Sequence, residues 1–241
     1  MSPGEIGASA LAGRTVVVLD ILRATTSIVE ALGAGARSVF PVGSIEEAIH
    51  LANNFGRAEV LLAGERRCLP IEGFDLGNSP REFTPDRVGG KTIVITTTNG
   101  TAAMSLTVNA ERVYIGALSN LSALVEQLVR TGAEPVFLCS GRERHFALED
   151  VTVAGRFAQA LMDARPGDWT LNDGARAAGV LAREFGVDVP MFQLAAGGQG
   201  IIEAGLAEDL AVCARVDTRD IIPVLHERSI TILPSSVPAT Q

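Results

Sequence analysis

The 241-residue chain has few aromatic residues and few cysteines, and it lacks a long apolar run. Aromatic residues make up 5% of the chain, so we expect a core of Val, Leu, Ile and Ala. The cysteines, Cys68, Cys139 and Cys213, lack metal-ligand spacing, which argues against a zinc site or a disulfide framework. No apolar run approaches the ~20 residues that span a bilayer, and no signal-peptide pattern opens the chain. These absences predict a soluble, cytoplasmic protein without a membrane partner.

The chain also lacks an excess of basic residues, since its formal net charge is -8. This charge argues against nucleic acid as the main partner. It is compatible with a small anionic substrate, because local arginines or a bound cation can reverse the field inside a site. The length predicts one large domain or two small ones. We expect residues 1–13 to form an irregular lead-in and residues 14–241 a single domain, with room for two lobes around a cleft.

Strand and helix patterns alternate along the chain, which predicts an α/β fold with a largely parallel sheet. Residues 16–19 form an unbroken apolar run typical of a buried strand. Ser44 and Glu47 form a capping-box pattern that predicts a helix over residues 45–53. Further strands are expected at residues 39–42, 59–63, 92–96, 113–116, 136–139, 221–224 and 230–232, and further helices near residues 149–162, 174–185 and 208–215. The glycine-rich residues 195–200 and the long segment 68–90 are expected to be loops, the latter long enough to suggest a functional role.

Four of the predicted strands end in polar turns: at Asp20, at Glu65, at residues 96–101 and at residues 140–142. Because the carboxyl ends of parallel strands share one edge of a sheet, these turns can face one cleft. The sequence therefore predicts a ligand site at this edge.

The turn after the first strand carries Asp20, Arg23, Thr25 and Thr26. A carboxylate at this place suits Mg²⁺ or acid–base chemistry, and arginine is a fixed cation for phosphate, sulfonate or carboxylate. The threonines offer hydroxyls and N–H groups at an expected helix start, where an anion is favoured. The alternative is structural: Asp20 and Thr25 cap the helix, and Arg23 is a solvated charge.

Further polar residues have both a functional and a structural interpretation. The turn Thr97, Thr98, Asn99, Gly100 and Thr101 resembles an anion cradle before a helix, and its alternative is a strand end with Thr101 as N-cap. Asp75 lies among glycines and turn residues, where it can bind metal or belong to an ordinary turn. Glu149 and Asp150 open a helix, where interaction with the helix dipole is the alternative to catalysis.

Several well-known phosphatase and hydrolase chemistries do not fit the spacing. Haloacid-dehalogenase phosphatases need a second acid two residues after the nucleophilic aspartate, and Leu22 occupies that position. Cysteine phosphatases need an arginine six residues after the cysteine, and His145 occupies the position that would serve Cys139. No Walker A motif and no Gly-x-Ser-x-Gly elbow occur.

Five ordered motifs resemble those of the 2-phosphosulfolactate phosphatase (ComB) family, and the resemblance covers nearly the whole chain after the first dozen residues. They are Asp-Ile-Leu-Arg-Ala-Thr-Thr (20–26), Ala-Gly-Glu-Arg (63–66), Gly-Phe-Asp-Leu-Gly-Asn-Ser-Pro (73–80), Thr-Thr-Asn-Gly-Thr (97–101) and Leu-Glu-Asp (148–150). The resemblance implies a three-layer α/β/α fold with a mixed sheet and Mg²⁺-dependent hydrolysis of 2-phospho-3-sulfolactate, a step toward coenzyme M. One departure is the Ala-Ala-Gly-Gly-Gln-Gly run at 195–200, where the family pattern leads us to expect a more polar loop.

These observations lead to a hypothesis of metal-assisted hydrolysis of a small, multiply anionic phosphate monoester. Mg²⁺ would be held by Asp20, Glu65 and Asp75, and Asp20 is also the best covalent nucleophile. Glu149 or Asp150 would act in acid–base catalysis. The phosphoryl group would be bound by Arg23, Thr25, Thr26 and the turn from Thr97 to Thr101, and a second anionic group by Arg66, Arg142 and Arg144.

Two other functions stay open at this point. The substrate can be another small phosphate ester, or the protein can bind a phosphometabolite without catalysis. The oligomeric state is also open, because helices on both faces of a sheet leave apolar patches that a homodimer can cover.

Overall fold

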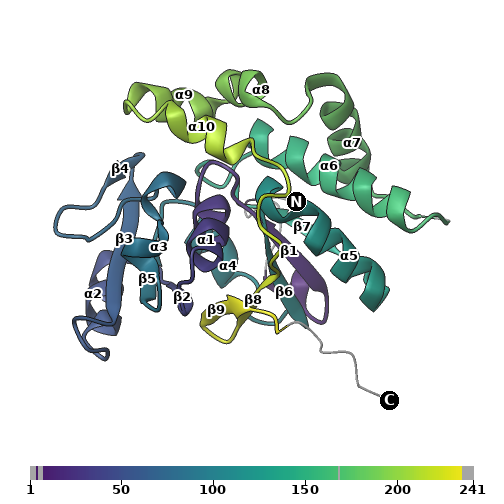
Figure 1. Cartoon of the computed structure of the whole chain (residues 1–241). Helices are drawn as coiled ribbons and strands as arrows, with labels where there is room; N and C mark the ends of the chain where they lie inside the picture. Colours follow the sequence, from purple (N-terminus) through teal and green to yellow (C-terminus); the bar gives the residue numbers. More distant parts are fainter. Residues whose placement is uncertain (1–3, 5–7, 168, 235–241) are drawn as a thin grey trace, which may run out of the picture.

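The computed structural model describes residues 4, 8–167 and 169–234, and its strands build one mixed sheet (Figure 1). The strands are β1 (Thr15–Leu19), β2 (Ser38–Pro41), β3 (Val60–Arg66), β4 (Leu69–Pro70), β5 (Thr92–Thr96), β6 (Arg112–Gly116), β7 (Val136–Cys139), β8 (Pro223–His226) and β9 (Ser229–Ile232). Their order in the sheet is β4-β3-β5-β2-β9-β8-β6-β1-β7.

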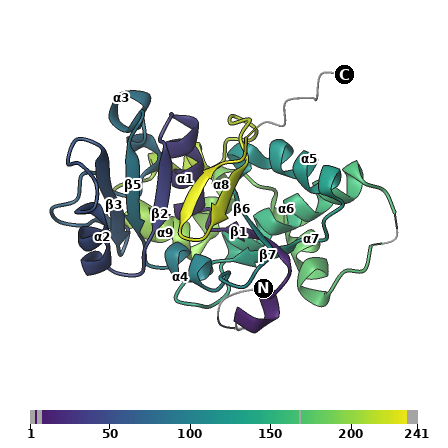
Figure 2. The same ribbon diagram turned by 90° about the horizontal axis from the view of Figure 1, so that it is seen from below.

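Two parallel groups of strands make up the two halves of this sheet. In one half β6, β1 and β7 are parallel, and in the other β3, β5 and β2 are parallel. The antiparallel hairpin β8–β9 joins them, since β9 pairs with β2 and β8 pairs with β6. Figure 2 shows this hairpin between the two halves. The predicted α/β fold with a largely parallel, mixed sheet is confirmed.

Helices cover both faces of the sheet and one of its edges. They are α1 (Ala24–Gly33), α2 (Ile45–Ala52), α3 (Pro85–Val88), α4 (Gly100–Ser105), α5 (Leu121–Thr131), α6 (Leu148–Ala164), α7 (Asp173–Phe185), α8 (Val189–Leu194), α9 (Ala196–Glu203) and α10 (Glu208–Cys213), with short 3-10 turns η1 (Ala8–Leu11), η2 (Pro80–Glu82) and η3 (Leu118–Asn120).

The alternation of side chains along β1 explains why this strand needs helices on both sides. Val16 and Val18 pack in one cluster with residues of α1 and α4, whereas Val17 and Leu19 pack in another with residues of α5 and α6. Successive residues of a strand point to opposite faces, so a strand that is apolar at every position is buried only in a three-layer arrangement. The expected α/β/α layers are therefore confirmed.

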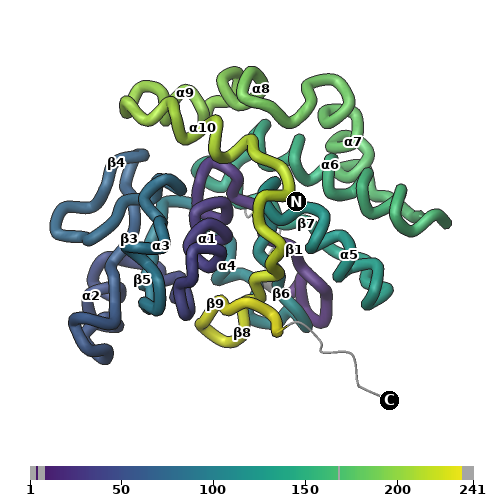
Figure 3. The backbone as a smooth tube through the Cα atoms, in the orientation of Figure 1, coloured from purple at the N-terminus to yellow at the C-terminus, as the bar shows by residue number. Residues whose placement is uncertain are grey.

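The helices α8, α9 and α10 form a layer over the edge of the sheet where β1 and β3 end (Figure 1). The chain then runs back beside α1 to the β8–β9 hairpin, a path that is clearest in the tube of Figure 3. Arg219, on this returning segment, pairs with Glu30 of α1 at 2.7 Å. The C-terminal fifth of the described chain thus contributes both to the sheet and to the cover over its carboxyl edge.

Residues 195–200 were expected to be a loop, and this prediction is wrong because most of them belong to α9. Glycine in a helix costs up to about 1 kcal/mol relative to alanine, which is why the pattern suggests a loop. Close packing explains the residue choice, since a Cβ atom on Gly198 would lie 1.8 Å from the carbonyl oxygen of Phe192 in α8. Residues 68–90, also expected to be irregular, contain β4, η2 and α3.

The other expected elements occur with small shifts at their ends, and β8 and β9 are present as predicted. Of the expected lead-in, residues 1–3 and 5–7 lie outside the described residues, and Ala8–Leu11 forms a 3-10 turn. No helix in the described ranges is long and apolar enough to cross a membrane.

Candidate active site

Four buried carboxylates gather at the carboxyl edge of the sheet. They belong to Asp20, Glu65, Glu149 and Asp150, and none is more than 7% exposed. Asp20 follows β1, Glu65 lies within β3, and the other two open α6. Strands β1 and β3 lie in different halves of the sheet, so neighbouring strands alone do not bring their carboxylates together.

The turn after β5 makes the connection between the two halves. The N–H of Thr98 donates to Glu65 Oε1 at 2.7 Å. Two residues later, Gly100 lies against Asp20, since a Cβ atom there would be 2.8 Å from Asp20 Oδ2. Glu65 Oε2 accepts from the N–H of Cys68 at 2.9 Å. The Thr97–Thr101 turn therefore lies between Glu65 and Asp20, as the sequence predicts for turns that share an edge.

The glycine before Glu65 allows the backbone of β3 to approach β5 closely. Gly64 has a φ of +156°, and a Cβ atom on it would lie 2.2 Å from the carbonyl oxygen of Thr96. Only glycine allows β3 and β5 to approach this closely at the point where Glu65 emerges.

Asp150 holds the loops that follow β1 and β7. Its Oδ1 accepts from the N–H of Ile21 at 2.9 Å, and its Oδ2 accepts from the N–H of Gly141 at 3.0 Å and from Ser140 Oγ at 3.2 Å. Burial raises the pKa of Asp150 well above its ordinary value, and the charges of Asp20 and Glu149 raise it further against the effect of the N–H donors. Through these hydrogen bonds, the carboxyl group of Asp150 fixes the loops that follow β1 and β7.

Asp20 is held by the first turn of α1. Its Oδ1 accepts from the N–H of Ala24 at 3.0 Å. Burial raises the pKa of Asp20; hydrogen bonds from Ala24 and Ser140 lower it, the charge of Glu65 raises it and that of Arg23 lowers it. The carboxylate is both a helix-capping group, as the structural alternative predicts, and a member of the acidic cluster.

Thr25 and Thr26 shape this loop from within. The Thr25 hydroxyl donates to the Asp20 carbonyl oxygen at 3.0 Å, and the Thr26 hydroxyl donates to the Ile21 carbonyl oxygen at 2.9 Å. Both residues are at most 1% exposed. The structure thus gives these hydroxyls a structural role, and the expectation that they contact a phosphoryl group gains no support from it.

Glu149 lies under the helix α9. A Cβ atom on Gly197 would be 2.1 Å from Glu149 Oε1, so α9 approaches this carboxylate as closely as a glycine allows. Burial raises the pKa of Glu149; its own backbone N–H lowers it, the charge of Asp20 raises it and that of Arg142 lowers it. A carboxyl group in this environment tends to hold its proton.

The arginines expected at the site have different environments. Arg23 is 3% exposed and pairs with Asp209 of α10 at 2.7 Å. Arg66 donates to Thr96 Oγ1 at 3.0 Å and is partly buried. Arg142 and Arg144 are exposed on the turn after β7, and Arg142 donates to the carbonyl oxygen of Ala196 in α9. This turn is closed by paired backbone hydrogen bonds between Arg142 and His145.

Asp75 is the one predicted metal ligand that the structure keeps apart from the others. Its carboxylate pairs with Arg57 at 2.8 Å and accepts from the N–H of Leu62 at 2.9 Å. Leu62 lies three residues before Glu65 along β3, so Asp75 is beside the middle of that strand. The residues around Asp75 therefore form turns that pack along β3.

Sequence reasoning missed Asp209 and Ser140 as residues of this region. Asp209 follows Glu208 at the start of α10, where an acidic pair is explained by the helix dipole. No short-range pattern links it to Arg23, which is 186 residues away in the chain. Ser140 belongs to a polar turn that was predicted, but its hydroxyl's place between Asp20 and Asp150 depends on the packing of α6.

The donor set fits a divalent cation that keeps part of its hydration shell. Among the described residues, no group of three or more His, Cys, Asp or Glu side chains is arranged to hold a metal ion by itself. Mg²⁺ commonly binds through one or two carboxylates together with water and substrate phosphate. Asp20 and Glu65 can serve in this way, and the buried negative charge of the cluster, with Arg23 already paired, favours a cation.

Known proteins resemble this chain along almost its whole length. The model of the 2-phosphosulpholactate phosphatase family matches residues 1–228. The chain belongs to this family. A probable 2-phosphosulfolactate phosphatase of Caldanaerobacter subterraneus subsp. tengcongensis is 40% identical over 215 residues, covering 88% of each chain. Proteins of the same name from Symbiobacterium thermophilum and Clostridium beijerinckii are 38% and 32% identical, and each alignment covers at least 94% of this chain and 97% of the relative. The family to which this chain belongs is one of phosphoric monoester hydrolases.

Proposed function

We propose that the chain is a Mg²⁺-dependent phosphatase that hydrolyses 2-phospho-3-sulfolactate to 3-sulfolactate and phosphate. The observation that carries the proposal is the junction of Asp20, Glu65 and the Thr97–Thr101 turn at the carboxyl edge, in a chain of the 2-phosphosulfolactate phosphatase family. Two carboxylates can bind a cation, and neighbouring backbone N–H groups can bind a phosphoryl group.

Asp20 and Glu65 are the residues that would hold the cation. When bound, Mg²⁺ would neutralise phosphoryl charge and orient the ester. Arg23 adds a fixed positive charge beside Asp20, and the start of α4 lies against the Asp20 carboxylate. These groups would stabilise the charge that develops on the phosphoryl oxygens in the transition state.

Glu149 is our candidate for the general acid, because its raised pKa favours the protonated form. In hydrolysis the bond between phosphorus and the ester oxygen breaks, an oxygen nucleophile bonds to phosphorus, and a proton must reach the leaving alkoxide. Glu149 would supply that proton. The nucleophile is either the Asp20 carboxylate, through a phosphoaspartate that water then hydrolyses, or water directly.

Arg142 is our candidate for binding the sulfonate. Arg142 is exposed on the turn after β7, and its charge lowers the pKa of Glu149. Its side chain donates to the carbonyl oxygen of Ala196 in α9. Arg66 is tied to Thr96, so it is less free to turn toward a ligand. A substrate with a sulfonate and a carboxylate needs such a cation beyond the phosphoryl site.

The testing experiment measures phosphate release from 2-phospho-3-sulfolactate and from a panel of sugar and hydroxy-acid phosphates, first with Mg²⁺ and then with EDTA. Strong preference for the sulfonate ester and loss of activity in EDTA would support the proposal. Metal-dependent activity on other esters without this preference would move the assignment to another small phosphate monoester. Turnover that is unchanged in EDTA would refute the role of the cation.

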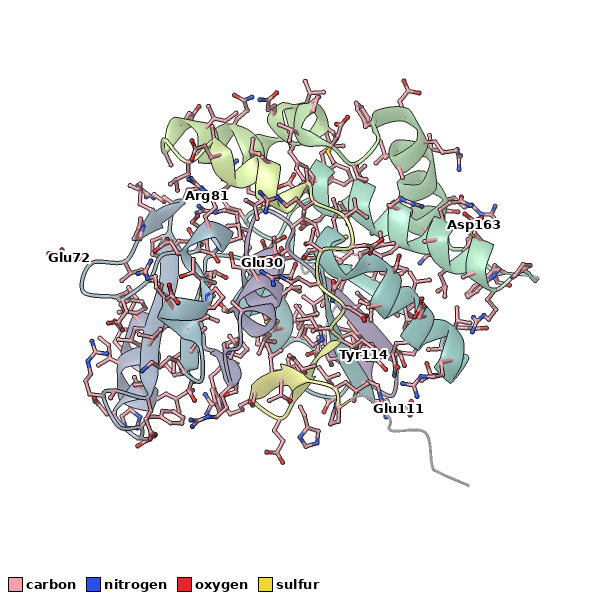
Figure 4. All side chains as sticks on the ribbon, viewed as in Figure 1. Glu30, Glu72, Arg81, Glu111, Tyr114 and Asp163 are labelled. Atoms are coloured by element: carbon pink, nitrogen blue, oxygen red, sulfur yellow. The ribbon has the colours of Figure 1, made fainter. Side chains whose placement is uncertain are left out.

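Asp20→Asn tests the central residue, and Asp163→Asn is its matched control. Asp163 is exposed on α6, far from α9 and α10 (Figure 4). We expect the Asp20 variant to lose at least about 100-fold in kcat and the control to keep its activity. Full activity of the Asp20 variant would remove Asp20 from the chemistry.

A further inference from the structure

A deeply buried ion pair near the site joins Arg23 to Asp209. The Arg23 Nη1 to Asp209 Oδ2 distance is 2.7 Å, and the two side chains are 2% and 0% exposed. Arg23 precedes α1, and Asp209 lies in the first turn of α10. The pair thus connects the loop of Asp20 to the helical layer over the carboxyl edge.

Both members of the pair have additional partners. Asp209 Oδ1 accepts from Ser79 Oγ at 2.6 Å, and Arg23 Nη2 donates to the carbonyl oxygen of Cys68 at 2.9 Å. Cys68 in turn donates its N–H to Glu65. Hydrogen bonds therefore lead from α10 through Arg23 and Cys68 to Glu65, one of the two carboxylates proposed to hold the cation. The other, Asp20, is influenced by the charge of Arg23.

Attachment of α10 does not by itself require this pair. Leu210 and Cys213 of α10 are buried in the apolar cluster beneath it. The neighbouring residue Glu208 pairs with Arg81 at 2.5 Å on the surface, and Figure 4 shows Arg81 at the boundary with α10. A buried ion pair pays a large desolvation cost and is often no more stabilising than apolar residues of similar size. Its place beside Asp20 points instead to control of where the guanidinium lies.

We propose that Asp209 is a positioning residue, which fixes the guanidinium of Arg23 beside Asp20 and Cys68 so that α10 completes the anion-binding side of the site. This inference rests on the proposed phosphatase function. Arginine has several rotatable bonds, and an unpaired Arg23 would be free to turn toward the neighbouring carboxylates. Asp209 removes that freedom before substrate binds, and small displacements of a binding group can cost about 100-fold in rate.

The test combines turnover with binding of inorganic phosphate, measured by calorimetry on the full-length protein, for the wild type and Asp209→Asn. We expect the variant to bind phosphate about 10-fold more weakly and to lose about 10- to 100-fold in kcat/KM, after correction for the folded fraction. Glu30→Gln is the matched control, because Glu30 pairs with Arg219 at the same 2.7 Å distance (Figure 4 labels Glu30). This control should lose stability and keep its phosphate affinity.

A double-mutant cycle separates positioning from a merely structural role. If Asp209 acts through Arg23, the phosphate affinity of Arg23→Met should not fall further when Asp209→Asn is added. Losses that add in the double variant, or wild-type affinity and kcat/KM in Asp209→Asn with only a lower Tm, would overturn the proposal.

Two further results keep the test decisive. If Asp209→Asn does not fold, Ser79→Ala is the substitute variant, because it removes one hydrogen bond from Asp209 and leaves both charges of the ion pair. The phosphate affinity of the Ser79 variant should fall about 3-fold. An unchanged affinity would mark the ion pair as structural. If the wild type hydrolyses no ester, the proposed function fails, and the phosphate measurements still decide the inference. A wild type that does not bind phosphate would overturn it.

Discussion

Gly100 lies so close to Asp20 that a Cβ atom on it would be 2.8 Å from Asp20 Oδ2 and 2.6 Å from the Cβ atom of Ala24. Gly100 begins α4, and its backbone does not have a positive φ. The glycine is therefore required for space and not for backbone conformation. The start of α4 is held against the carboxylate proposed to bind the cation.

Gly100→Ala should consequently displace Asp20 or move α4 away from it. We expect kcat/KM to fall about 10- to 100-fold, because misplacement of a reacting group by about 1 Å can have this effect. Gly174→Ala is a suitable control, since its Cβ would have only an ordinary contact of 3.5 Å with Asn172. Wild-type kcat/KM in the Gly100 variant would show that this contact does not position the reacting groups.

The contact between Gly197 and Glu149 leads to a second prediction, with a control in the same helix. A Cβ atom on Gly197 would lie 2.1 Å from Glu149 Oε1, whereas one on Gly200 would lie 3.7 Å from Arg142 Nη1 and from Cys68 Sγ. Gly197→Ala should therefore displace Glu149 and lower kcat about 10-fold or more. Gly200→Ala should raise the free energy of unfolding by up to about 1 kcal/mol through helix propensity. Equal effects of the two changes on kcat would argue against Glu149 as the acid.

Asp75 provides a third prediction, which separates the sequence hypothesis from the structure. Since its carboxylate is paired with Arg57 and with the N–H of Leu62, Asp75→Asn should keep the Mg²⁺ dependence of the activity. The free energy of unfolding should fall by about 1 kcal/mol, as expected for one impaired hydrogen bond. Titration of activity with Mg²⁺ makes the comparison, and a clearly higher Mg²⁺ requirement in the variant would restore Asp75 as a ligand.

Much of the fold could be predicted because its signals are local. The apolar run of β1 identifies a strand covered on both faces, and Ser44 caps α2 by accepting from the N–H of Glu47 as its sequence pattern predicts. The helix α9 escaped prediction because its glycines are selected by close contacts with Phe192 and Glu149. Those contacts depend on the tertiary structure, which overrides the low helix propensity of glycine.

The part of the site that could be predicted is the part formed where strands end. Asp20, Glu65 and the Thr97–Thr101 turn come together because parallel strands end at one edge and the turn after β5 reaches both carboxylates. Hydroxyl groups show the limit of this reasoning: the sequence cannot tell that Thr25 bonds the backbone of its own loop. Nor can it pair Arg23 with Asp209, which lies at the far end of the chain.

The carboxyl cluster predicts an unusual dependence of stability on pH. The pKa of Asp150 is raised well above its ordinary 3.8, by burial first and then by Asp20 and Glu149. The native state therefore binds this proton more tightly than the unfolded chain does, and the free energy of unfolding should fall as the pH rises above the ordinary carboxyl range. The measurement is urea unfolding in EDTA, which keeps bound cations from masking the effect.

Asp150→Asn isolates this contribution. At about pH 5 the variant should be less stable than the wild type by about 1–3 kcal/mol, because its amide cannot accept from both Ile21 and Gly141. As the pH rises to about 8, the wild type must ionise the buried group while the variant does not, so the difference should shrink. The loss of one charge should also lower the pKa of Asp20 and of Glu149, which further flattens the variant's curve. A difference that grows with pH would mean that Asp150 is stabilised as the ion, and that its hydrogen-bond donors outweigh burial and the neighbouring charges.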